Sequence, residues 1–366
     1  MKYIDEYRDK RIAQNILQKI NIISKKKVNL MEVCGTHTVA IFRNDIKKIL
    51  PTNINLISGP GCPVCVTPVS HIDEIISLSR KEDFIITTFG DMIRIPGSTS
   101  TLEKEKTNSA DIRIVYSTLD ALKIAQNNPS QEVIFMGVGF ETTSPTIASA
   151  ILKAQEGKIN NFSVLSVAKI MPPVMKALLE SKEVNIDGFI CPGHVSAIIG
   201  SQPFNFIAAQ YGVPCVICGF EPLDILEGIY MLINQIENDK AEVEIQYKRV
   251  VKPEGNRIAL ERINEVFKVV DSNWRGIGNI HHSGLEIKDK YNQHNARRFK
   301  VEIEETKETR GCRCGEVLRG IIIPPECPLF GEICTPEDPQ GACMVSSEGT
   351  CAAYYKYSRG RPCVCP

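Results

Sequence analysis

The C-terminal part of the chain concentrates six cysteines within forty residues, and thiols at that density predict metal or redox chemistry. Their spacing matches neither the C-x2-C-x2-C run of bacterial ferredoxins nor the paired C-x2-C knuckles of zinc ribbons. Six thiols are two more than a four-ligand site needs, so we expect four to bind an iron–sulfur cluster and two to form a redox disulfide beside it. Structural zinc is the alternative. These residues, which we call the cysteine cassette, are Cys312, Cys314, Cys327, Cys334, Cys343 and Cys351.

A further pair of thiols, Cys62 and Cys65, stands in the sequence GPGCPVC, between an expected strand and a helix that begins near Val69. The dipole and the free N–H groups of a helix start stabilise a thiolate, and the C-x-x-C spacing lets two thiols close a small disulfide ring. The pattern therefore indicates a dithiol/disulfide pair or half of a metal site. Two incidental buried cysteines are the structural alternative.

The sequence CGTHT places Cys34 and His37 directly after another expected strand. Open α/β sheets bind their ligands at the carboxyl ends of strands, so both side chains are expected at a cleft. The soft thiolate of Cys34 and the imidazole three residues later could share one metal, or His37 could donate a proton. A nucleophilic Cys34–His37 pair is one alternative, and a structural cysteine is the other.

The bulk composition excludes several classes of function. The chain has 366 residues, 43 basic and 43 acidic side chains, and a formal net charge of zero. It lacks the basic excess expected of a protein that binds nucleic acid or an anionic membrane. No apolar stretch reaches the roughly 20 residues of a membrane span, and the charged N-terminus is not typical of a secretory signal. We expect a cytoplasmic protein, where 14 cysteines favour metal or redox chemistry over static disulfides.

Short apolar runs alternate with amphipathic segments along most of the chain, which predicts parallel sheets covered by helices. The expected strands are 29–33, 55–58, 84–89, 112–116, 132–138, 163–168, 188–191, 215–218 and 242–250. The expected helices are 69–80, 119–127, 144–155, 174–181, 223–237 and 256–271.

The fold class that follows is α/β, with two similar parallel-sheet α/β domains plus a loop- and helix-rich iron–sulfur domain. We place the first domain, with the CGTHT and CPVC motifs, at residues 1–128, the second at 129–250 and the cluster domain at 251–366. A weak internal echo between MEVCGTHTVAI and MGVGFETTSPTIA supports two similar units. Prolines forbid long regular elements in the cysteine cassette, so a metal cluster would hold that segment together.

Taken together, the motifs resemble those of the HypD family of hydrogenase maturation factors. The resemblance covers nearly the whole chain, from about residue 31 to about residue 357, and its motifs follow one another in order. It rests on CGTHT (Cys34–Thr38), GPGCPVC (Gly59–Cys65), GFETT (Gly139–Thr143), CPGH (Cys191–His194) and the cassette through SSEGTCAAYYKY.

The resemblance implies a redox-active iron–sulfur scaffold, or metallochaperone, for the iron centre of [NiFe]-hydrogenases, in which iron carries cyanide and carbon monoxide. Family members form a complex with the small chaperone HypC, on which the Fe(CN)2CO unit is assembled. Cyanide made from carbamoyl phosphate by HypF and HypE is transferred to this iron, and the product passes to the hydrogenase large subunit. The family also has two α/β domains and a third domain that holds a [4Fe–4S] cluster.

The resemblance also implies roles for single residues. Cys34 matches the family cysteine that holds the iron of the Fe(CN)2CO unit, together with a cysteine of HypC, and His37 would support this site. Cys62 and Cys65 match a thiol pair that exchanges electrons at the iron. The implied electron path starts at the cluster, passes through a disulfide of the cassette and then through Cys62–Cys65, and ends at Cys34.

Similarity to ferredoxin-thioredoxin reductase, which places a disulfide against its cluster, implies how the cassette divides. The redox disulfide would be Cys314–Cys343. Exchanging Cys312 with Cys314 suits the sequence almost as well. The implied cluster ligands are Cys312, Cys327, Cys334 and Cys351.

Two rival functions come from other classes. A passive assembly platform would have a purely structural cluster. A stand-alone iron–sulfur thiol oxidoreductase would reduce generic disulfides without a HypC-like partner, but it has no use for the third thiol motif with Cys34. The tail RPCVCP adds Cys363 and Cys365, for which the resemblance implies no role, and we interpret them as incidental thiols.

Overall fold

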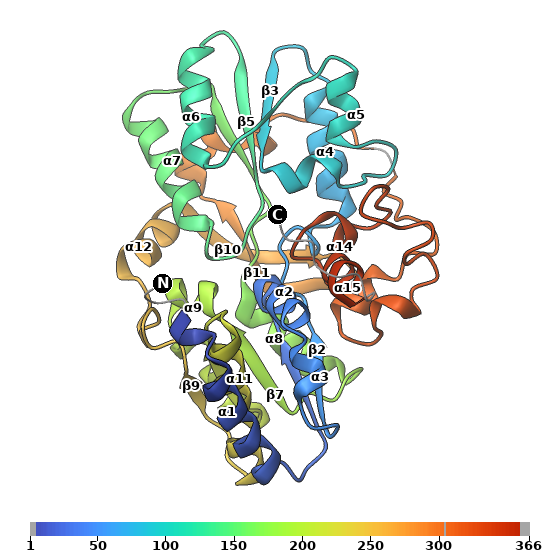
Figure 1. The fold of residues 1–366 in the computed structure, drawn as a ribbon. Helices are drawn as coiled ribbons and strands as arrows, with labels where there is room; N and C mark the ends of the chain where they lie inside the picture. Colours follow the sequence, from blue (N-terminus) through green and yellow to red (C-terminus); the bar gives the residue numbers. More distant parts are fainter. Residues whose placement is uncertain (1–4, 304, 359–366) are drawn as a thin grey trace.

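The computed structural model describes residues 5–303 and 305–358, so our interpretation of Cys363 and Cys365 lies outside the described residues. The chain forms two α/β lobes, one above the other in Figure 1, with the cysteine cassette beside their junction. The strands within each main sheet are parallel, which confirms the predicted fold class.

The first lobe is built on a five-stranded sheet in the order β2-β1-β7-β8-β9. Its strands alternate between two cores: Leu30 packs with the helices of one face, and Met31 packs toward the other face and the cassette. The strands are β1 (Val28–Glu32), β2 (Ile54–Ser58), β7 (Gly188–Pro192), β8 (Cys215–Cys218) and β9 (Val243–Ile245). The helices of this lobe are α1 (Lys10–Ile23), α2 (Gly35–Arg43), α3 (Ile46–Ile49), α8 (Met171–Ser181), α9 (Gly193–Ile199), α10 (Asn205–Tyr211) and α11 (Pro222–Glu237).

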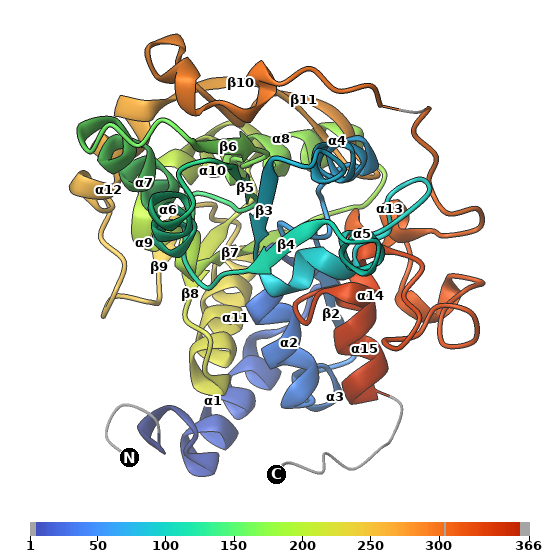
Figure 2. The same cartoon turned by 90° about the horizontal axis from the view of Figure 1, so that it is seen from above.

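The second lobe is a four-stranded sheet in the order β4-β3-β5-β6, with helices on both faces (Figures 1 and 2). Helix α4 packs against one face, and α6 and α7 pack against the other. The strands are β3 (Phe84–Thr88), β4 (Asp111–Ile114), β5 (Glu132–Gly137) and β6 (Phe162–Ser166). The helices are α4 (Val69–Ser79), η2 (Gly90–Arg94), α5 (Leu102–Thr107), α6 (Thr118–Asn127) and α7 (Ser144–Glu156).

The path of the chain links the two lobes twice. It begins the first sheet with β1 and β2, builds all of the second sheet, and returns to complete the first sheet with β7, β8 and β9. The boundary that we placed at residue 128 lies between β4 and β5, which are two strands of the same sheet. Within the first sheet, β1 and β2 pair in parallel with Glu32 opposite Ser58, so their carboxyl ends lie side by side.

The predicted helix over residues 256–271 is wrong beyond residue 266. Helix α12 (Arg257–Val266) is followed at once by strand β10 (Phe267–Trp274), which pairs antiparallel with β11 (Gly278–Ile287). Burial alternates residue by residue in β10, and Phe267, Val269 and Val270 are residue types that favour strands. The region predicted as the cluster domain from residue 251 therefore also contains the β10–β11 hairpin (Figure 2). The side chains of this hairpin pack in the cores of both lobes.

The cysteine cassette has little regular structure, as its prolines predict. Its core is continuous with that of the first lobe, since Cys314 and Cys343 pack in one buried cluster with Met31, Cys62 and Cys65. Its elements are α13 (Cys314–Leu318), η6 (Pro324–Glu326), α14 (Ala342–Val345) and α15 (Thr350–Ser358). The remaining short helices are η1 (Asp5–Tyr7), η3 (Gln202–Phe204), η4 (Asp289–His294) and η5 (Ala296–Arg298).

Among residues 5–303 and 305–358, no helix combines the length and the apolar character that crossing a bilayer requires.

Candidate functional site

The site forms where two motifs meet at the ends of β1 and β2. Cys34 is the residue that precedes helix α2, and the N–H of Gly35 donates a hydrogen bond of 3.0 Å to the carbonyl of Gly61. A Cβ atom on Gly61 would lie 2.2 Å from the backbone nitrogen of Cys34. Only glycine permits this approach, and it brings the CGTHT and GPGCPVC motifs into direct backbone contact.

Replacing Gly61 with alanine should therefore misplace Cys34. We expect Gly61→Ala to lower the free energy of unfolding by about 1–3 kcal/mol, the usual cost of overpacking, and to weaken metal binding at Cys34 at least tenfold. Thermal unfolding and titration with Fe²⁺ would measure the two effects. The matched control is Gly90→Ala, because a Cβ atom there meets only Ile114, at 3.8 Å, and both quantities should remain near wild type.

Cys34 is buried, and this burial raises the pKa of its thiol to about 12. The negative charges of Glu348 and Glu32 act in the same direction, while the backbone N–H groups of His37 and Thr36, at the start of α2, oppose them. The free side chain is thus a protonated thiol at neutral pH, which differs from the ready thiolate that we expected. A metal ion at this site must displace the thiol proton.

Two carboxylates flank Cys34, and our sequence reasoning missed both as parts of the site. Glu32 is buried at the end of β1, where its carboxylate accepts hydrogen bonds from the Cys34 N–H (3.0 Å) and the Thr38 hydroxyl (2.5 Å). Burial raises the pKa of Glu32 to about 7. The sequence feature that could have indicated Glu32 is a single acidic residue at the end of an apolar, buried strand.

Glu348 comes from the other end of the chain, in the loop between α14 and α15. Its carboxylate accepts a hydrogen bond of 2.7 Å from the Thr36 hydroxyl, and its Cβ atom would lie 2.6 Å from a Cβ atom on Gly35. The cassette loop thus packs against the first turn of α2. No local pattern in the sequence indicates this pairing, which spans 312 positions.

His37 lies on α2 with Cys34, but its imidazole packs toward the end of β8. Its Nε2 is 2.9 Å from the Gly219 carbonyl, and its ring lies 4.7 Å from that of Phe220, which also stacks on His194. Burial lowers the pKa of His37 to about 4, so the ring is neutral and Nε2 carries the proton donated to Gly219. Its Nδ1 is buried and has no hydrogen-bond partner among residues 5–303 and 305–358. His37 therefore positions the start of α2, and it is unsuited to donate a proton at neutral pH.

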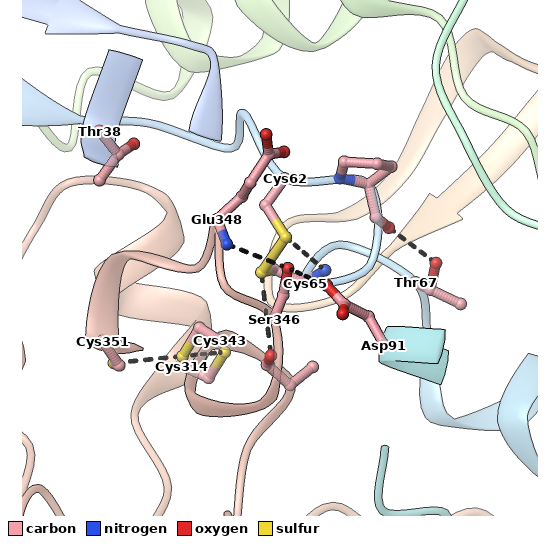
Figure 3. Close-up of a disulfide and its surroundings, with 12 residues drawn as sticks. Thr38, Cys62, Cys65, Thr67, Asp91, Cys314, Cys343, Ser346, Glu348 and Cys351 are labelled. Atoms are coloured by element: carbon pink, nitrogen blue, oxygen red, sulfur yellow. Dashed lines mark hydrogen bonds between the residues drawn. A yellow bond between two sulfur atoms is a disulfide. The ribbon is translucent and has the colours of Figure 1, made fainter. Parts of the chain in front are cut away.

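Cys62 and Cys65 are joined by a disulfide, with Cα atoms 5.2 Å apart. The pair is buried, and Figure 3 shows it between Glu348 and the thiols of the cassette. The Sγ atom of Cys65 lies 3.9 Å from the carbonyl of Ala342, the residue before Cys343. The disulfide therefore connects the surroundings of Cys34 with the cassette.

The cassette thiols lie together within one small region. The Sγ atom of Cys343 is 3.0 Å from that of Cys314 and 3.2 Å from that of Cys351, and Cys312 is hydrogen-bonded to Cys314. The Sγ atom of Cys334 accepts a hydrogen bond from the Gln340 N–H at 3.3 Å.

This donor set fits a soft metal centre, because it offers several buried thiols and a backbone N–H directed at sulfur. A Cβ atom on Gly341 would lie 2.8 Å from the Sγ atom of Cys312, so glycine lets the chain pass close to the thiols. The distances place Cys343 almost equally near Cys314 and Cys351. The division into four ligands and one disulfide therefore stays a prediction.

A surface cleft of about 610 Å³ opens between the first turn of α2 and the cassette. Its lining includes Thr36 and Glu348, the two neighbours that bridge α2 and the cassette loop, as well as Asp91 and Arg94 of η2 and Tyr355 of α15. The Ser346 hydroxyl of the cassette loop donates a hydrogen bond of 3.1 Å to Asp91 (Figure 3). All three parts of the molecule thus meet at one opening.

Glu141, from the GFETT motif, serves a different purpose. Its carboxylate accepts a hydrogen bond of 2.9 Å from the N–H of Met171, the first residue of α8. Its second oxygen is buried and has no partner within the described part of the chain. Burial raises its pKa from 4.5 to about 7. The folded state therefore binds this proton more tightly than the unfolded state does.

The stability that this proton contributes is fully present below about pH 4.5 and is lost as the pH rises through about 7. We expect Glu141→Gln to remove about 3 kcal/mol of that pH dependence, which urea unfolding at about pH 4.5 and about pH 8 would measure. The exposed Glu103→Gln control should follow the wild type. A Glu141→Gln protein that also follows the wild type would contradict this account.

Comparison with known proteins identifies relatives along the whole chain. The HypD family model, described as the hydrogenase formation hypA family, matches residues 11–358. The chain is 45% identical over 372 residues to hydrogenase maturation factor HypD2 of Bradyrhizobium diazoefficiens, with 99% of this chain and 98% of that protein covered. It is 44% identical over 370 residues to HypD of Cupriavidus necator and 42% identical over 366 residues to HypD of Escherichia coli, and each match covers 98% of both chains.

Proposed function

The chain belongs to the HypD family of hydrogenase maturation factors, and from this premise we propose that it carries, on Cys34, the iron that becomes the Fe(CN)2CO unit of a [NiFe]-hydrogenase. One observation carries the proposal. Cys34 is enclosed by the CPVC loop on one side and by the cassette loop with Glu348 on the other, so three distant motifs converge on one thiol. A structural cysteine would need none of this convergence.

The charges around Cys34 support a cationic cargo. Glu32 and Glu348 disfavour a free thiolate, and the same two carboxylates stabilise a positive ion that replaces the thiol proton. Iron bound by Cys34 would gain electron density from the thiolate, which strengthens its bonds to π-accepting cyanide and carbon monoxide. Binding of iron therefore releases the proton of the Cys34 thiol, and it also favours the charged form of Glu32, whose pKa burial raises to about 7.

We assign the thiol pairs to electron supply. Reduction of Cys62–Cys65 takes two electrons and two protons, and it yields two thiols next to the cargo. A [4Fe–4S] cluster, when bound by Cys312, Cys327, Cys334 and Cys351, would supply single electrons. The remaining pair, Cys314 and Cys343, would form the second dithiol, as their 3.0 Å separation allows.

A hydrogenase maturation factor works with other maturation proteins. We propose a HypC-type chaperone that contributes a second thiolate to the iron, HypE as the cyanide donor supplied by HypF, and the hydrogenase large subunit as the acceptor. The cleft lined by Thr36 and Glu348 supports this arrangement, because it offers a partner an opening next to the first turn of α2, which Cys34 precedes.

The test is anaerobic copurification of the full chain with its HypC-type partner, followed by infrared spectroscopy. Bands in the stretching regions of cyanide and carbon monoxide are expected from the complex. Their absence from a complex that contains iron and sulfide would contradict the proposal. Reduction of generic disulfides by the chain alone would instead favour a stand-alone oxidoreductase, and full maturation by a Cys314→Ser variant would favour a passive platform.

A further inference from the structure

Arg275 lies in the turn between β10 and β11, where it contacts two parts of the redox machinery. Its backbone N–H donates to the Val66 carbonyl at 2.9 Å, and its Nε donates to the Thr67 carbonyl at 2.9 Å. Both acceptors directly follow the Cys62–Cys65 disulfide in the chain. On the other side of the turn, a Cβ atom on Gly276 would lie 2.1 Å from the Cα atom of Gly315 in helix α13.

The guanidinium of Arg275 lacks a complete set of partners. The residue is only 6% exposed, and its Nη2 has no hydrogen-bond partner among the residues that the structure describes. Arginine stays charged in proteins, and burying a charge is costly unless an anion compensates for it. This arrangement indicates an anion next to Nη2.

The cysteine cassette lies directly against the turn that carries Arg275. Trp274, which precedes Arg275, packs in one buried cluster with Cys314 and Cys343. Gly276, which follows Arg275, lies against Gly315, the residue after Cys314. Several thiolates around an iron–sulfur core carry a net negative charge, and one-electron reduction adds another. A fixed buried cation stabilises the more negative state more strongly.

We propose that Arg275 is a positioning residue that supplies the counter-charge for the cassette's sulfur centre, favours its reduced state and holds the disulfide loop against it. The inference rests on the cluster assigned under the proposed function. It adds a residue that none of the cysteine motifs contains, and it explains why the hairpin turn is inserted between the disulfide and α13.

Redox titration of the reconstituted, full-length protein tests this proposal, with dithionite as the reductant and the visible absorption of the cluster as the signal. In Arg275→Gln, the ratio of reduced to oxidised cluster at a fixed potential should fall about tenfold, which corresponds to about 59 mV for one electron. Arg275→Lys keeps the charge and should stay within about threefold of the wild-type ratio. Arg275→Met, a second uncharged variant, should agree with the glutamine variant.

Arg319→Gln is the matched control, because it removes an arginine that follows α13 and pairs with Glu183. Its midpoint potential should equal that of the wild type. Iron and sulfide content and thermal unfolding would show that each variant is folded and loaded. If Arg275 only holds the loop, the lysine variant should shift as far as the glutamine variant, or neither should shift, and either result would overturn the proposal.

A measurement on the wild-type protein covers the case in which no uncharged variant folds. When arginine is labelled with ¹⁵N, hyperfine spectroscopy of the reduced protein should detect a ¹⁵N coupling to the cluster spin that the Arg275→Lys protein lacks, since Arg313 beside Cys312 stays labelled in both. Identical couplings in the two proteins would overturn the contact. A wild-type protein that binds neither iron nor sulfide would contradict the cluster itself. Those two failures are distinguishable, because only the second removes the visible absorption.

Discussion

Cys34→Ala should abolish the infrared bands of the iron-bound cyanide and carbon monoxide while leaving the visible absorption of the cassette unchanged. The reason is structural: Cys34 is the thiol that lies between the two flanking carboxylates, and the cassette thiols come from another segment. Maturation of hydrogenase should fall at least a hundredfold. The fold should persist, since removing one buried thiol costs about 1 kcal/mol.

Cys215→Ala is the matched control for this experiment. Cys215 is also a free, buried cysteine of the first lobe, but it lies on β8. Its replacement should leave both the infrared bands and the visible absorption intact. If the Cys34→Ala protein still matured hydrogenase, the cargo would have to be held elsewhere, and the proposed function would fail at its central residue.

Replacing cassette cysteines one at a time should divide the cassette into two classes. Loss of a cluster ligand, as in Cys334→Ser, should remove most of the bound iron and sulfide and all of the visible absorption. Thermal stability should fall as well, because the short elements of the cassette have few other constraints and metal binding contributes to folding. Iron and sulfide analysis together with thermal unfolding would measure both losses.

Cys314→Ser and Cys343→Ser should instead keep the absorption and lose maturation. The comparison of Cys343→Ser with Cys351→Ser is the most informative, because the Sγ atom of Cys343 lies 3.0 Å from Cys314 and 3.2 Å from Cys351. If the Cys343→Ser protein lost its absorption and the Cys351→Ser protein kept it, these two residues would exchange roles.

Each of the nine predicted strands has a counterpart, since buried parallel strands such as β5 and β6 appear in the sequence as continuous apolar runs. The strand predicted over 242–250 is wrong beyond residue 245, where the edge strand β9 ends. The sequence after Val266 resembles a continuation of the helix, because α12 is amphipathic and no loop separates it from β10. The two-residue alternation of β10 extends over only eight residues. The order of strands in space was not predictable from such runs. Pairing of β1 with β7, for example, depends on contacts between segments 158 positions apart.

In the candidate site, too, local motifs were predictable and contacts between distant segments were not. Its cysteine motifs were visible because glycine, proline and cysteine at fixed spacing have few structural uses. Glu348 and Arg275 were not predictable as parts of it, because each acts through a tertiary contact with a distant residue, Thr36 in one case and Thr67 in the other. The motif resemblance, by contrast, agrees with the family match over residues 11–358.

The interrupted path of the first sheet has a consequence during synthesis on the ribosome. Cys34 leaves the ribosome early, but β7, its strand's neighbour, follows about 150 residues later, and Glu348 belongs to the last loop before α15. At about 5–20 residues per second, the surroundings of Cys34 take many seconds to become complete. A nascent chain therefore presents the Cys34 thiol beside Glu32 but without Glu348, and the proposed selective binding of iron begins only after the loop that carries Glu348 has been synthesised.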